Sequence, residues 1–347
     1  MDDSCPGADA ISIVNGKISG INAIDHNCNS IDLKGAVVIP GFTDAHFHLT
    51  NLGKQIDTLQ LRDCHSSTEI AEKVLEKSKE LNSDEWIFGF GWDHNKWDTP
   101  TFPKEEVLNG LAISQPVMLT RIDGHSCWVN QKAMKLSGLD VAADPPDGGD
   151  IINDCILIDN AMDPVQFIIP KPNKALVEKW IKLALEIIIP RGITNVHDAW
   201  QDPTVVKVLS KLSEQGELPI RVYGMLGSSH NKLLDQFFKK GNQQIGNYTI
   251  RSVKAFIDGA LGSRGAALLE PYSDDLNTCG LILISNEKFR ELAKRCKDAG
   301  FQLCTHAIGD RGNRMVLDVY EEAANGVKNH RWRIEHAQMV CDEDIPR

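Results

Sequence analysis

The sequence predicts an α/β protein with a parallel β-sheet covered by helices. From Val37 onward, short apolar runs alternate with amphipathic helical segments. The runs are almost continuously hydrophobic, as in strands that are buried on both faces. A (β/α)8 barrel and a doubly wound sheet both fit this alternation. No GxGxxG motif follows an apolar run, so the nucleotide-binding form of the doubly wound sheet has no support.

Composition excludes several classes of protein. The chain has 347 residues, of which 42% are hydrophobic and 24% charged, as is typical of a soluble globular protein. The 37 Lys and Arg against 48 Asp and Glu give a net charge of -11, which argues against nucleic-acid and anionic-membrane partners. No apolar run reaches the ~18 residues of a membrane span, and no signal peptide is visible. Nine cysteines without a CxxC pair indicate reduced thiols and a cytoplasmic protein.

The strands are predicted in order along the chain. Residues 11–21 (ISIVNGKISGI) alternate around Asn15-Gly16, which predicts a type I′ hairpin ahead of the main domain. The apolar runs then predict the strands of the sheet. They are VVIPGFTDAHFH, WIFGFGWDH, PVMLTRIDGH, ITNVHDA, PIRVYGML, VKAFIDGA, FQLCTHAIGD and RWRIEHA.

The helices between them have ordinary start and stop signals. A capping box from Ser66 to Glu69 opens a helix that carries Ile70, Val74 and Leu75 on one face. Residues 174–189, 286–299 and 312–325 are apolar at helical spacing and end at or just before a glycine.

Polar side chains recur where the strands end. His46 and His48 share one face of the first run, and Lys254 points away from the apolar face of its run. His306 and His336 lie about one βαβ repeat apart, which predicts equivalent heights on neighbouring strands, with Ile334 and His336 on one face. Each residue alone also fits a hydrogen-bonded core histidine or a paired lysine. Because active-site groups of a barrel come from the C-terminal ends of its strands, their recurrence favours a clustered metal site.

Lys254 and the loops add to this site. A lysine that faces a barrel interior is costly unless it is paired, neutral or modified. A neutral Lys254 can add CO2, and the carbamate could bridge two metal ions. The stretches GWDHNKW and DGHSCW fit either a packed insertion or a lid over the site. We favour the lid, in which Trp92 would line an apolar pocket and His94 and His125 would contact substrate. The glycine-rich run with Arg264 fits either a ligand-approaching or a structural loop.

These stretches closely resemble the amidohydrolase superfamily. Within it, they are most similar to the amidohydrolase-3 subgroup of YtcJ-like proteins, typified by N-substituted formamide deformylase. The matching stretches, in order, are VIPGFTDAHFHL, GWDHNKW, RIDGHSCWVN, GITNVHDA, RVYGML, KAFIDGALGSRGAALLEPYSDD, THAIGDRGNRMVLD and RWRIEHAQ. The resemblance implies a metal-dependent (β/α)8 barrel with a small β-sandwich built from both chain ends. Residues 1–40 would then be a partial β-sandwich segment, and residues 41–347 the barrel, with a lid-like insertion within residues 50–190.

The resemblance also implies roles for individual residues. The expected metal ligands are His46, His48, Lys254, His306 and His336, with Lys254 carboxylated and bridging. Lys254 and His306 are thereby also the expected catalytic residues, through their ligand roles. The expected substrate contacts are Trp92, His94, His125, His197 and Arg264. The cofactor would be one or two divalent metal ions, with zinc favoured and iron or manganese as alternatives.

The chain departs from the family at one point. The family has two more barrel strands after RIEHA, and the eighth carries an Asp that binds metal and shuttles the proton. This sequence ends at Arg347, and Asp342 and Asp344 lie at the start of a helix rather than at a strand end. We therefore expect about six barrel strands, in a fragment or truncated form of such an enzyme.

The resulting hypothesis is an amidohydrolase that acts on carbon–nitrogen bonds other than peptide bonds. Its substrate would be a small N-acyl or N-formyl amide, attacked by a metal-bound hydroxide, with the oxyanion held by the metal and by His197 or groups beside His306. Two alternatives stay open. The same site could serve an esterase or lactonase, or the chain could be a catalytically inactive relative with a binding or regulatory role. The expected partner is the small molecule, without nucleic acid or membrane, and a homo-oligomer is compatible with the sequence.

Overall fold

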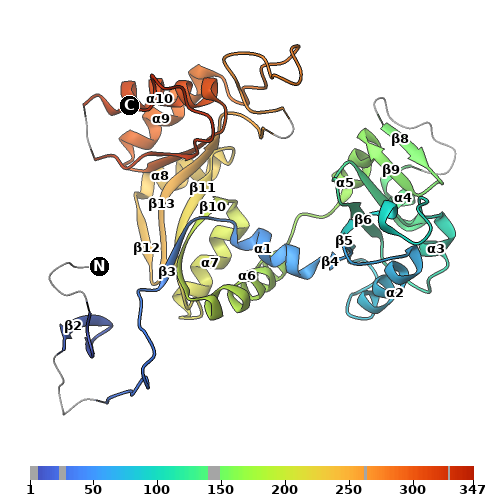
Figure 1. Cartoon of the computed structure of the whole chain (residues 1–347), viewed down its shortest axis with the longest axis horizontal. Helices are drawn as coiled ribbons and strands as arrows, with labels where there is room; N and C mark the ends of the chain where they lie inside the picture. Colours follow the sequence, from blue (N-terminus) through green and yellow to red (C-terminus); the bar gives the residue numbers. More distant parts are fainter. Residues whose placement is uncertain (1–6, 23–28, 140–148, 262–263, 327–328) are drawn as a thin grey trace. The chain divides into compact units, whose positions relative to one another are not determined.

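The computed structural model describes residues 7–22, 29–139, 149–261, 264–326 and 329–347, and Figure 1 shows its elements. Met1–Pro40 and Gly41–Arg347 form two compact units. In the first unit, β1 (Ile11–Val14) pairs antiparallel with β2 (Lys17–Ile21). Asn15 and Gly16 between them have φ values of 50° and 73°. Two consecutive positive φ values define the type I′ turn, so the predicted hairpin is confirmed.

Six parallel strands form the main sheet of the second unit, and they neighbour each other in chain order. They are β3 (Phe42–Phe47), β10 (Ile193–Gln201), β11 (Arg221–Gly227), β13 (Tyr248–Phe256), β14 (Gln302–Ala307) and β15 (Arg333–His336). The short β12 (Gln243–Ile245) adds to β13 in the antiparallel sense. A doubly wound sheet would reverse its strand order, whereas a barrel keeps chain order. The predicted TIM-like barrel fold with about six strands is therefore confirmed.

The sheet is strongly curved. β3 and β15 are its two edge strands. Even so, Nη2 of Arg333 on β15 donates a hydrogen bond of 2.9 Å to the carbonyl oxygen of Ala45 on β3. A flat sheet of six strands, spaced about 4.8 Å apart, could not bring its edges this close. The first and last strands therefore face each other across the concave side.

The convex side of this sheet packs against helices and holds the main core (Figure 1). The helices are α1 (Leu49–Asp57), α6 (Lys174–Ile188), α7 (Pro203–Glu214), α8 (Asn231–Lys240), α9 (Asn286–Asp298) and α10 (Asp310–Ala324). Val253, Ala255 and Ile257 are fully buried in this core, as their alternation predicts. On β13, Lys254 alternates with them, so its side chain belongs to the concave side.

The helix boundaries follow the sequence signals closely. Ser66 Oγ accepts the Glu69 N–H at 3.1 Å and begins α2 (Ser67–Ser78). Ile70 and Val74 are buried, but Leu75 is 37% exposed, so its predicted place on the apolar face is corrected. α10 begins at Asp310, two residues before the predicted residue 312. The reason is that the buried Asp258 carboxylate accepts the N–H groups of Ile308 and Gly309 just before it.

A second sheet is formed by residues 59–159. Its strand order is β4-β5-β6-β7-β9-β8, parallel from β4 to β6 and antiparallel beyond. The strands are β4 (Leu59–Gln60), β5 (Ile87–Trp92), β6 (Val117–Arg121), β7 (Ser126–Val129), β8 (Gly149–Ile152) and β9 (Ile156–Asp159). The helices α2, α3 (Glu105–Asn109), α4 (Gln131–Ser137) and α5 (Asp163–Ile168) pack against it. Single 3-10 turns are His94–Lys96, Asn160–Met162 and Ile189–Arg191.

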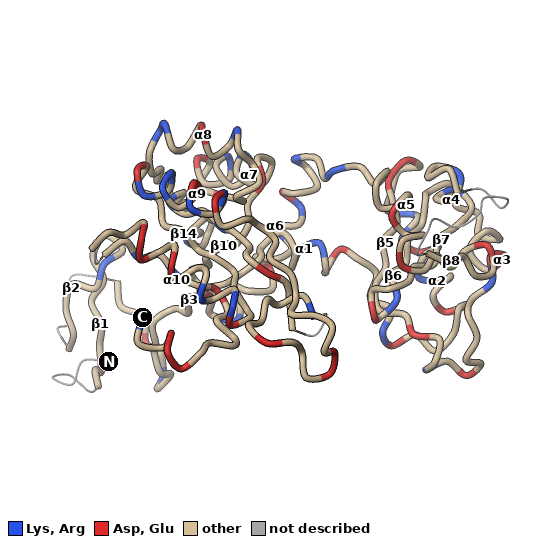
Figure 2. The backbone as a smooth tube through the Cα atoms, turned by 90° about the horizontal axis from the view of Figure 1, so that it is seen from above, with Lys and Arg blue, Asp and Glu red and all other residues tan. Residues whose placement is uncertain are grey.

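Charges of both signs are mixed along the described chain, and its cysteines form no disulfide bonds. Basic and acidic residues are interspersed along the backbone around both sheets of Gly41–Arg347 (Figure 2). The seven cysteines among the described residues are free thiols. Within the same described ranges, no helix has the length and apolar character to cross a bilayer.

Asp198 connects β10 to the beginning of α1. Its buried carboxylate accepts the Leu49 N–H at 2.7 Å and the Gln201 side-chain N–H at 2.7 Å. Gln201 in turn accepts the Tyr248 hydroxyl at 2.5 Å. Burial raises the pKa of Asp198 from 3.8 to about 6, in spite of the two hydrogen bonds. Asp198 therefore anchors the chain just after His48, although its burial in the fold disfavours the ionised form of its carboxylate.

The close packing of α1 on α6 predicts that Gly53→Ala is destabilising. A Cβ at Gly53 would lie 1.8 Å from the carbonyl oxygen of Trp180. Alanine normally stabilises a helix by ~1 kcal/mol relative to glycine, but this overlap with backbone should reverse the sign, for a net loss of about 2 kcal/mol. Denaturant unfolding measures the change. Gln55→Ala, on the exposed side of α1, is the control. Equal stability of G53A and wild type would contradict the packing.

The raised pKa of Asp198 predicts a pH-dependent stability. Between pH 3.8 and about 6, the folded chain binds this proton and the unfolded chain does not. The free energy of unfolding therefore falls as pH rises through that window, by about 3 kcal/mol at most from this group. In Asp198→Asn this component should vanish, while the exposed control Asp84→Asn keeps it. Urea unfolding from pH 4 to 7 tests this, and parallel wild-type and D198N curves would refute it.

Candidate active site

Four histidine rings meet at the C-terminal ends of the barrel strands. His46 lies on β3, His48 follows it, His306 lies on β14 and His336 ends β15. The centroid of the His46 ring is 5.3 Å from that of His48 and 4.7 Å from that of His336. His306 and His336 are also 4.7 Å apart. We call these four residues the histidine cluster, and the barrel topology brings them together from residues nearly 300 apart in the chain.

His336 reaches the cluster through an unusual backbone conformation. Its predicted position on one face with Ile334 is corrected, because Ile334 packs against the main core instead. Regular alternation would direct His336 the same way. However, its φ is 76° and that of Ala337 is 43°, both in the left-handed region that non-glycine residues rarely adopt. In addition, the register pairs His336 with Ala307 rather than with His306. The left-handed turn, held by the Ala337 N–H to Ala307 bond of 3.1 Å, thus aims the ring at its neighbours.

Lys254 is the buried amine of this region. Its side chain is fully buried, and Nζ has no hydrogen-bond partner among the described residues. The Nζ lies 4.9 Å from the centre of the Phe256 ring, and that ring is 5.1 Å from His306. Burial lowers the pKa of Lys254 to about 8, although the charge of Glu335 opposes the shift. At pH 7 about a tenth of this amine is therefore uncharged and nucleophilic, far more than at the usual pKa of a lysine.

Three histidines of the cluster, His48, His306 and His336, favour the neutral form. Burial, followed by the nearby His46, lowers the pKa of His48. Burial likewise lowers the pKa of His306. For His336, burial and then the neighbouring His306 and His46 bring the pKa down to about 4. Neutral imidazoles carry the lone pair that metal coordination requires.

Two charged residues next to the cluster were missed by the sequence analysis. Arg333 and Glu335 belong to RWRIEHA, in which only Ile334 and His336 attracted attention. Glu335 accepts from Arg333 Nε at 2.5 Å, and its other oxygen lies 2.5 Å from His46 Nδ1. Burial alone would raise the pKa of Glu335, but the His46 and Arg333 bonds lower it to about 2. Their alternation with the core residue Ile334 is the one signal that could have placed them on the concave side.

His197 lies on the same concave side. Its Nδ1 accepts a hydrogen bond of 3.0 Å from Arg333 Nη1, and its ring is 4.8 Å from that of Tyr223. Burial and the positive charge of Arg333 both lower its pKa. His197 is therefore a neutral residue fixed beside the cluster by the same guanidinium that holds Glu335.

Arg264 lies on the loop that follows β13. It pairs with Asp274, with Nη2 to Oδ2 at 3.2 Å, and its backbone has a positive φ of 53°. The loop is anchored by Asp258, which accepts the Ala267 N–H at 2.9 Å. Substrate contact by Arg264 stays a prediction, whereas the structural role of the loop is visible in these bonds.

The three substrate contacts predicted in the tryptophan-rich stretches lie in the second sheet or just beside its strands. Trp92 is fully buried, and its indole N–H donates to Leu119 O at 2.7 Å. The His94 ring packs 4.1 Å from that of Phe102. His125 is exposed, and its Nδ1 is 2.9 Å from Asp159. Trp92 thus fills a core position, and the roles of His94 and His125 as substrate contacts stay predictions.

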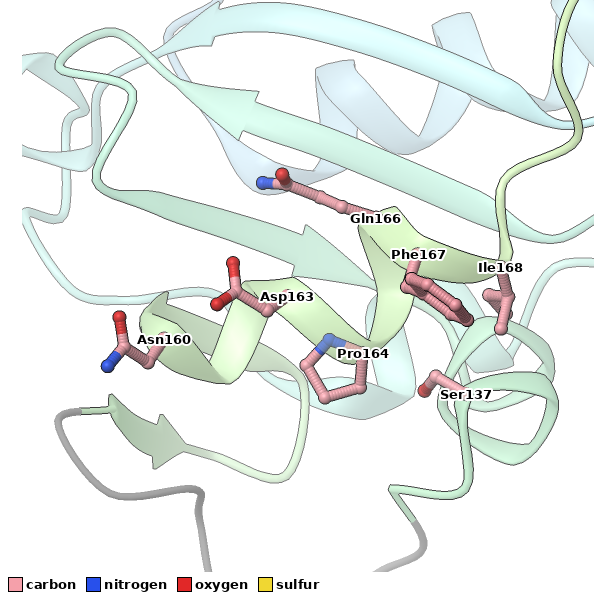
Figure 3. Close-up of a pocket in the computed structure, with 7 residues that line it drawn as sticks. All are labelled: Ser137, Asn160, Asp163, Pro164, Gln166, Phe167 and Ile168. Carbon is pink, nitrogen blue, oxygen red and sulfur yellow. The ribbon is translucent and has the colours of Figure 1, made fainter. Parts of the chain in front are cut away.

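A hollow of about 860 Å3 lies against α4 and α5 in the second sheet's layer of helices (Figure 3). Its lining is Ser137, Asn160, Asp163, Pro164, Gln166, Phe167 and Ile168. Asp163 is the only titratable side chain in that lining, which offers no pair of groups for acid–base or nucleophilic chemistry. The histidine cluster, rather than this hollow, is the candidate active site.

The chemistry of the cluster fits a divalent metal ion. No group of three or more His, Cys, Asp or Glu side chains in the described ranges is arranged to hold a metal ion. Two of the cluster's nitrogens instead face protein groups, His46 Nδ1 at Glu335 and His306 Nε2 at the Gly259 carbonyl 3.3 Å away. The donor set nevertheless suits zinc and related ions, because it combines neutral imidazoles with a buried amine that has no partner. In their present positions these side chains do not converge on one point, so they would have to move to hold an ion together.

Known proteins resemble this chain over most of its length. The relative LONG AFTER FAR-RED 3 of Arabidopsis thaliana is 30% identical over 379 residues, which are 98% of this chain and 63% of that protein. The amidohydrolase-family protein YtcJ of Bacillus subtilis is 30% identical over 360 residues, 98% of this chain and 67% of YtcJ. This chain therefore spans a little under two thirds of the first relative's length and about two thirds of the second's.

A solved structure has the same fold. The crystal structure of an uncharacterized metal-dependent hydrolase from Pyrococcus furiosus superimposes with a TM-score of 0.73 at 30% sequence identity. The match covers 88% of this chain and 61% of that one. Residues 29–347 also match the model of the amidohydrolase family. Together with the barrel order of the strands, these matches confirm the resemblance seen in the sequence: the chain belongs to the amidohydrolase family.

Proposed function

We propose that this protein is a metal-dependent hydrolase that cleaves a carbon–nitrogen bond in a small amide, such as an N-acyl or N-formyl amine. Membership of the amidohydrolase family supports hydrolysis, and the similar protein from Pyrococcus furiosus is described as a metal-dependent hydrolase. The observation that carries the proposal is that four imidazole rings lie close together near one buried lysine whose Nζ has no partner among the described residues.

The metal would be held by His46, His48, His306, His336 and Lys254. A divalent ion bound there would lower the pKa of a water molecule and polarise the substrate carbonyl. We favour zinc because imidazole nitrogens are among its usual ligands, and iron and manganese are alternatives. The depressed pKa of His336, about 4, keeps this ligand available over the whole physiological range.

The chain's own residues would bind and orient the substrate. Nδ1 of His197 is occupied by Arg333, so its Nε2 would carry a proton and could donate to the carbonyl oxygen as charge develops there. The Phe256 ring lies 5.1 Å from that of His306 and 5.2 Å from that of Trp200, and these two aromatic rings would exclude water from one side. None of these contacts depends on the leaving atom, so an ester or lactone is the competing substrate class.

Metal binding is the first test of this function. The chain is incubated with zinc, iron or manganese, dialysed, and its metal content measured by mass spectrometry. We expect retained metal in wild type and at least a tenfold loss of affinity in the double variant His46→Ala/His336→Ala, which removes two ligands. The exposed His65→Ala is the control. Equal retention by the double variant, or no retention by wild type, would overturn the proposal and favour a binding or regulatory role.

The reaction class is tested with a substrate panel. Formamides, N-acyl amino acids, esters and lactones are offered to the metal-loaded protein, and the released amine or alcohol is quantified. We expect amides to be turned over faster than esters of matched shape, and chelation of the metal to abolish turnover. Preference for lactones or esters would replace the amide proposal with an esterase or lactonase.

Lys254 is expected to be carboxylated. Its unprotonated Nζ would attack CO2, forming an N–C bond and losing one proton, to give a carbamate that can bind metal. NMR with 13C-labelled bicarbonate should show a carbamate signal in the metal-loaded wild type. The signal should be absent from Lys254→Met, which keeps the length and apolar stem of the side chain, and unchanged in the exposed control Lys54→Met. A carbamate signal that survives in K254M would contradict the assignment.

A further inference from the structure

We propose that the Arg333–Glu335 pair sets opposite tautomers on two histidines, so that His46 presents a lone pair at Nε2 and His197 presents a proton at Nε2. This inference rests on the proposed function for its purpose, since a metal ligand needs a lone pair and an oxyanion needs a donor. The tautomers themselves follow from hydrogen bonds of the chain alone. Arg333 and Glu335 are thus positioning residues, distinct from the ligands.

The first half of the argument concerns Glu335. Its side chain is 7% exposed, and one oxygen accepts from Arg333 Nε at 2.5 Å. An ionised carboxylate is an acceptor only. The other oxygen lies 2.5 Å from His46 Nδ1, so this nitrogen must carry the hydrogen of that bond. In the neutral form of His46 only one nitrogen is protonated, so with Nδ1 carrying that hydrogen, Nε2 keeps its lone pair.

The second half concerns His197. Arg333 Nη1 lies 3.0 Å from His197 Nδ1. A guanidinium is a donor only, so Nδ1 of His197 must be the acceptor and cannot hold a proton. Its single proton then sits on Nε2, and the ring offers a donor at that atom. One planar group thereby imposes a tautomer on His197 directly and on His46 through the carboxylate it fixes.

The fork geometry of arginine is required. Nε binds Glu335, Nη1 binds His197, and Nη2 donates to the Ala45 carbonyl at 2.9 Å, one residue before His46. Lysine has the charge but a single nitrogen, and it cannot make these three planar contacts at once. Arg333 is also too buried to be a solvated surface charge, since its side chain is 26% exposed.

The first experiment measures the tautomers directly. The metal-free chain is labelled with 15N-histidine, and the ring-nitrogen shifts are recorded by NMR at pH about 8, where imidazoles are neutral. We expect the Nδ1–H form for His46 and the Nε2–H form for His197. In Glu335→Gln, Arg333 holds the amide oxygen, so the amide NH2 should face His46 and switch it to the Nε2–H form. His197 should not change.

The variant Arg333→Lys tests the second half of the argument, the tautomer of His197. We expect His197 to lose its single tautomer and to become a mixture, because its donor is gone. The surface substitutions Glu343→Gln and Arg290→Lys are matched controls that should leave both histidines unchanged. Circular dichroism checks that each variant folds, and Glu335→Ala, which removes the acceptor of the His46 bond, serves if E335Q does not fold; there His46 should lose its single Nδ1–H form. An Nε2–H form of His46 in the wild type, or no switch in a folded E335Q, would overturn the proposal.

The second experiment measures the consequence for metal binding. Zinc affinity is determined by competition with a chromophoric chelator. We expect E335Q to bind zinc about 10-fold or more weakly than wild type, as for other groups that orient a ligand. In a His46→Ala background, E335Q should have no further effect, because its target is absent. Equal losses in both backgrounds would show a merely structural role and overturn the positioning role.

The two experiments keep this inference separate from the proposed function. The tautomers are read without metal or substrate, so a chain that hydrolyses no amide can still have them. Conversely, a chain that binds metal and cleaves amides but has a freely exchanging His46 tautomer would retain the function and lose the inference.

Discussion

The ion pair of Arg333 and Glu335 connects the two ends of the parallel sheet. β3 and β15 have no backbone ladder between them, and each is an edge strand. Instead, the two strands are joined by side-chain contacts across the concave side, from Arg333 to Ala45 and from Glu335 to His46. Without this curvature, residues at opposite edges of the sheet could not approach each other. The histidine cluster therefore depends on two charged residues that are not themselves part of it.

The two sides of the sheet have opposite chemistry. The convex side is apolar and packs against the helices, and it supplies the stability of the fold. The concave side carries a small apolar cluster of Ala199, Met225 and Cys304 beneath the polar groups. Burying Lys254 and partly shielding several imidazoles from water there disfavours their charged forms, which lowers their pKa values. The same burial that costs stability produces neutral ligands and a reactive amine.

Part of the site was predictable from the sequence because strand periodicity is local. Alternation placed Lys254 opposite Val253 and Ala255, and the spacing of His306 and His336 indicated neighbouring strands. His336 shows the limit of this reasoning, since its left-handed backbone overrides the alternation that Ile334 obeys. Arg333 and Glu335 show another limit. Charged residues in an apolar run look like a solvated edge until the fold reveals the partners 288 and 289 residues away.

By itself, the sequence determined the α/β class, the order of strands and helices, the hairpin at Asn15-Gly16 and the family. These features depend on local periodicity, turn chemistry and motifs, which a linear chain carries. The tertiary structure alone decided which polar groups meet: that Trp92 belongs to a core, that His336 turns back toward His46, and that Arg333 spans the concave side. These contacts join residues far apart in the chain, and their energies depend on burial and orientation that exist only once the sheet has curved.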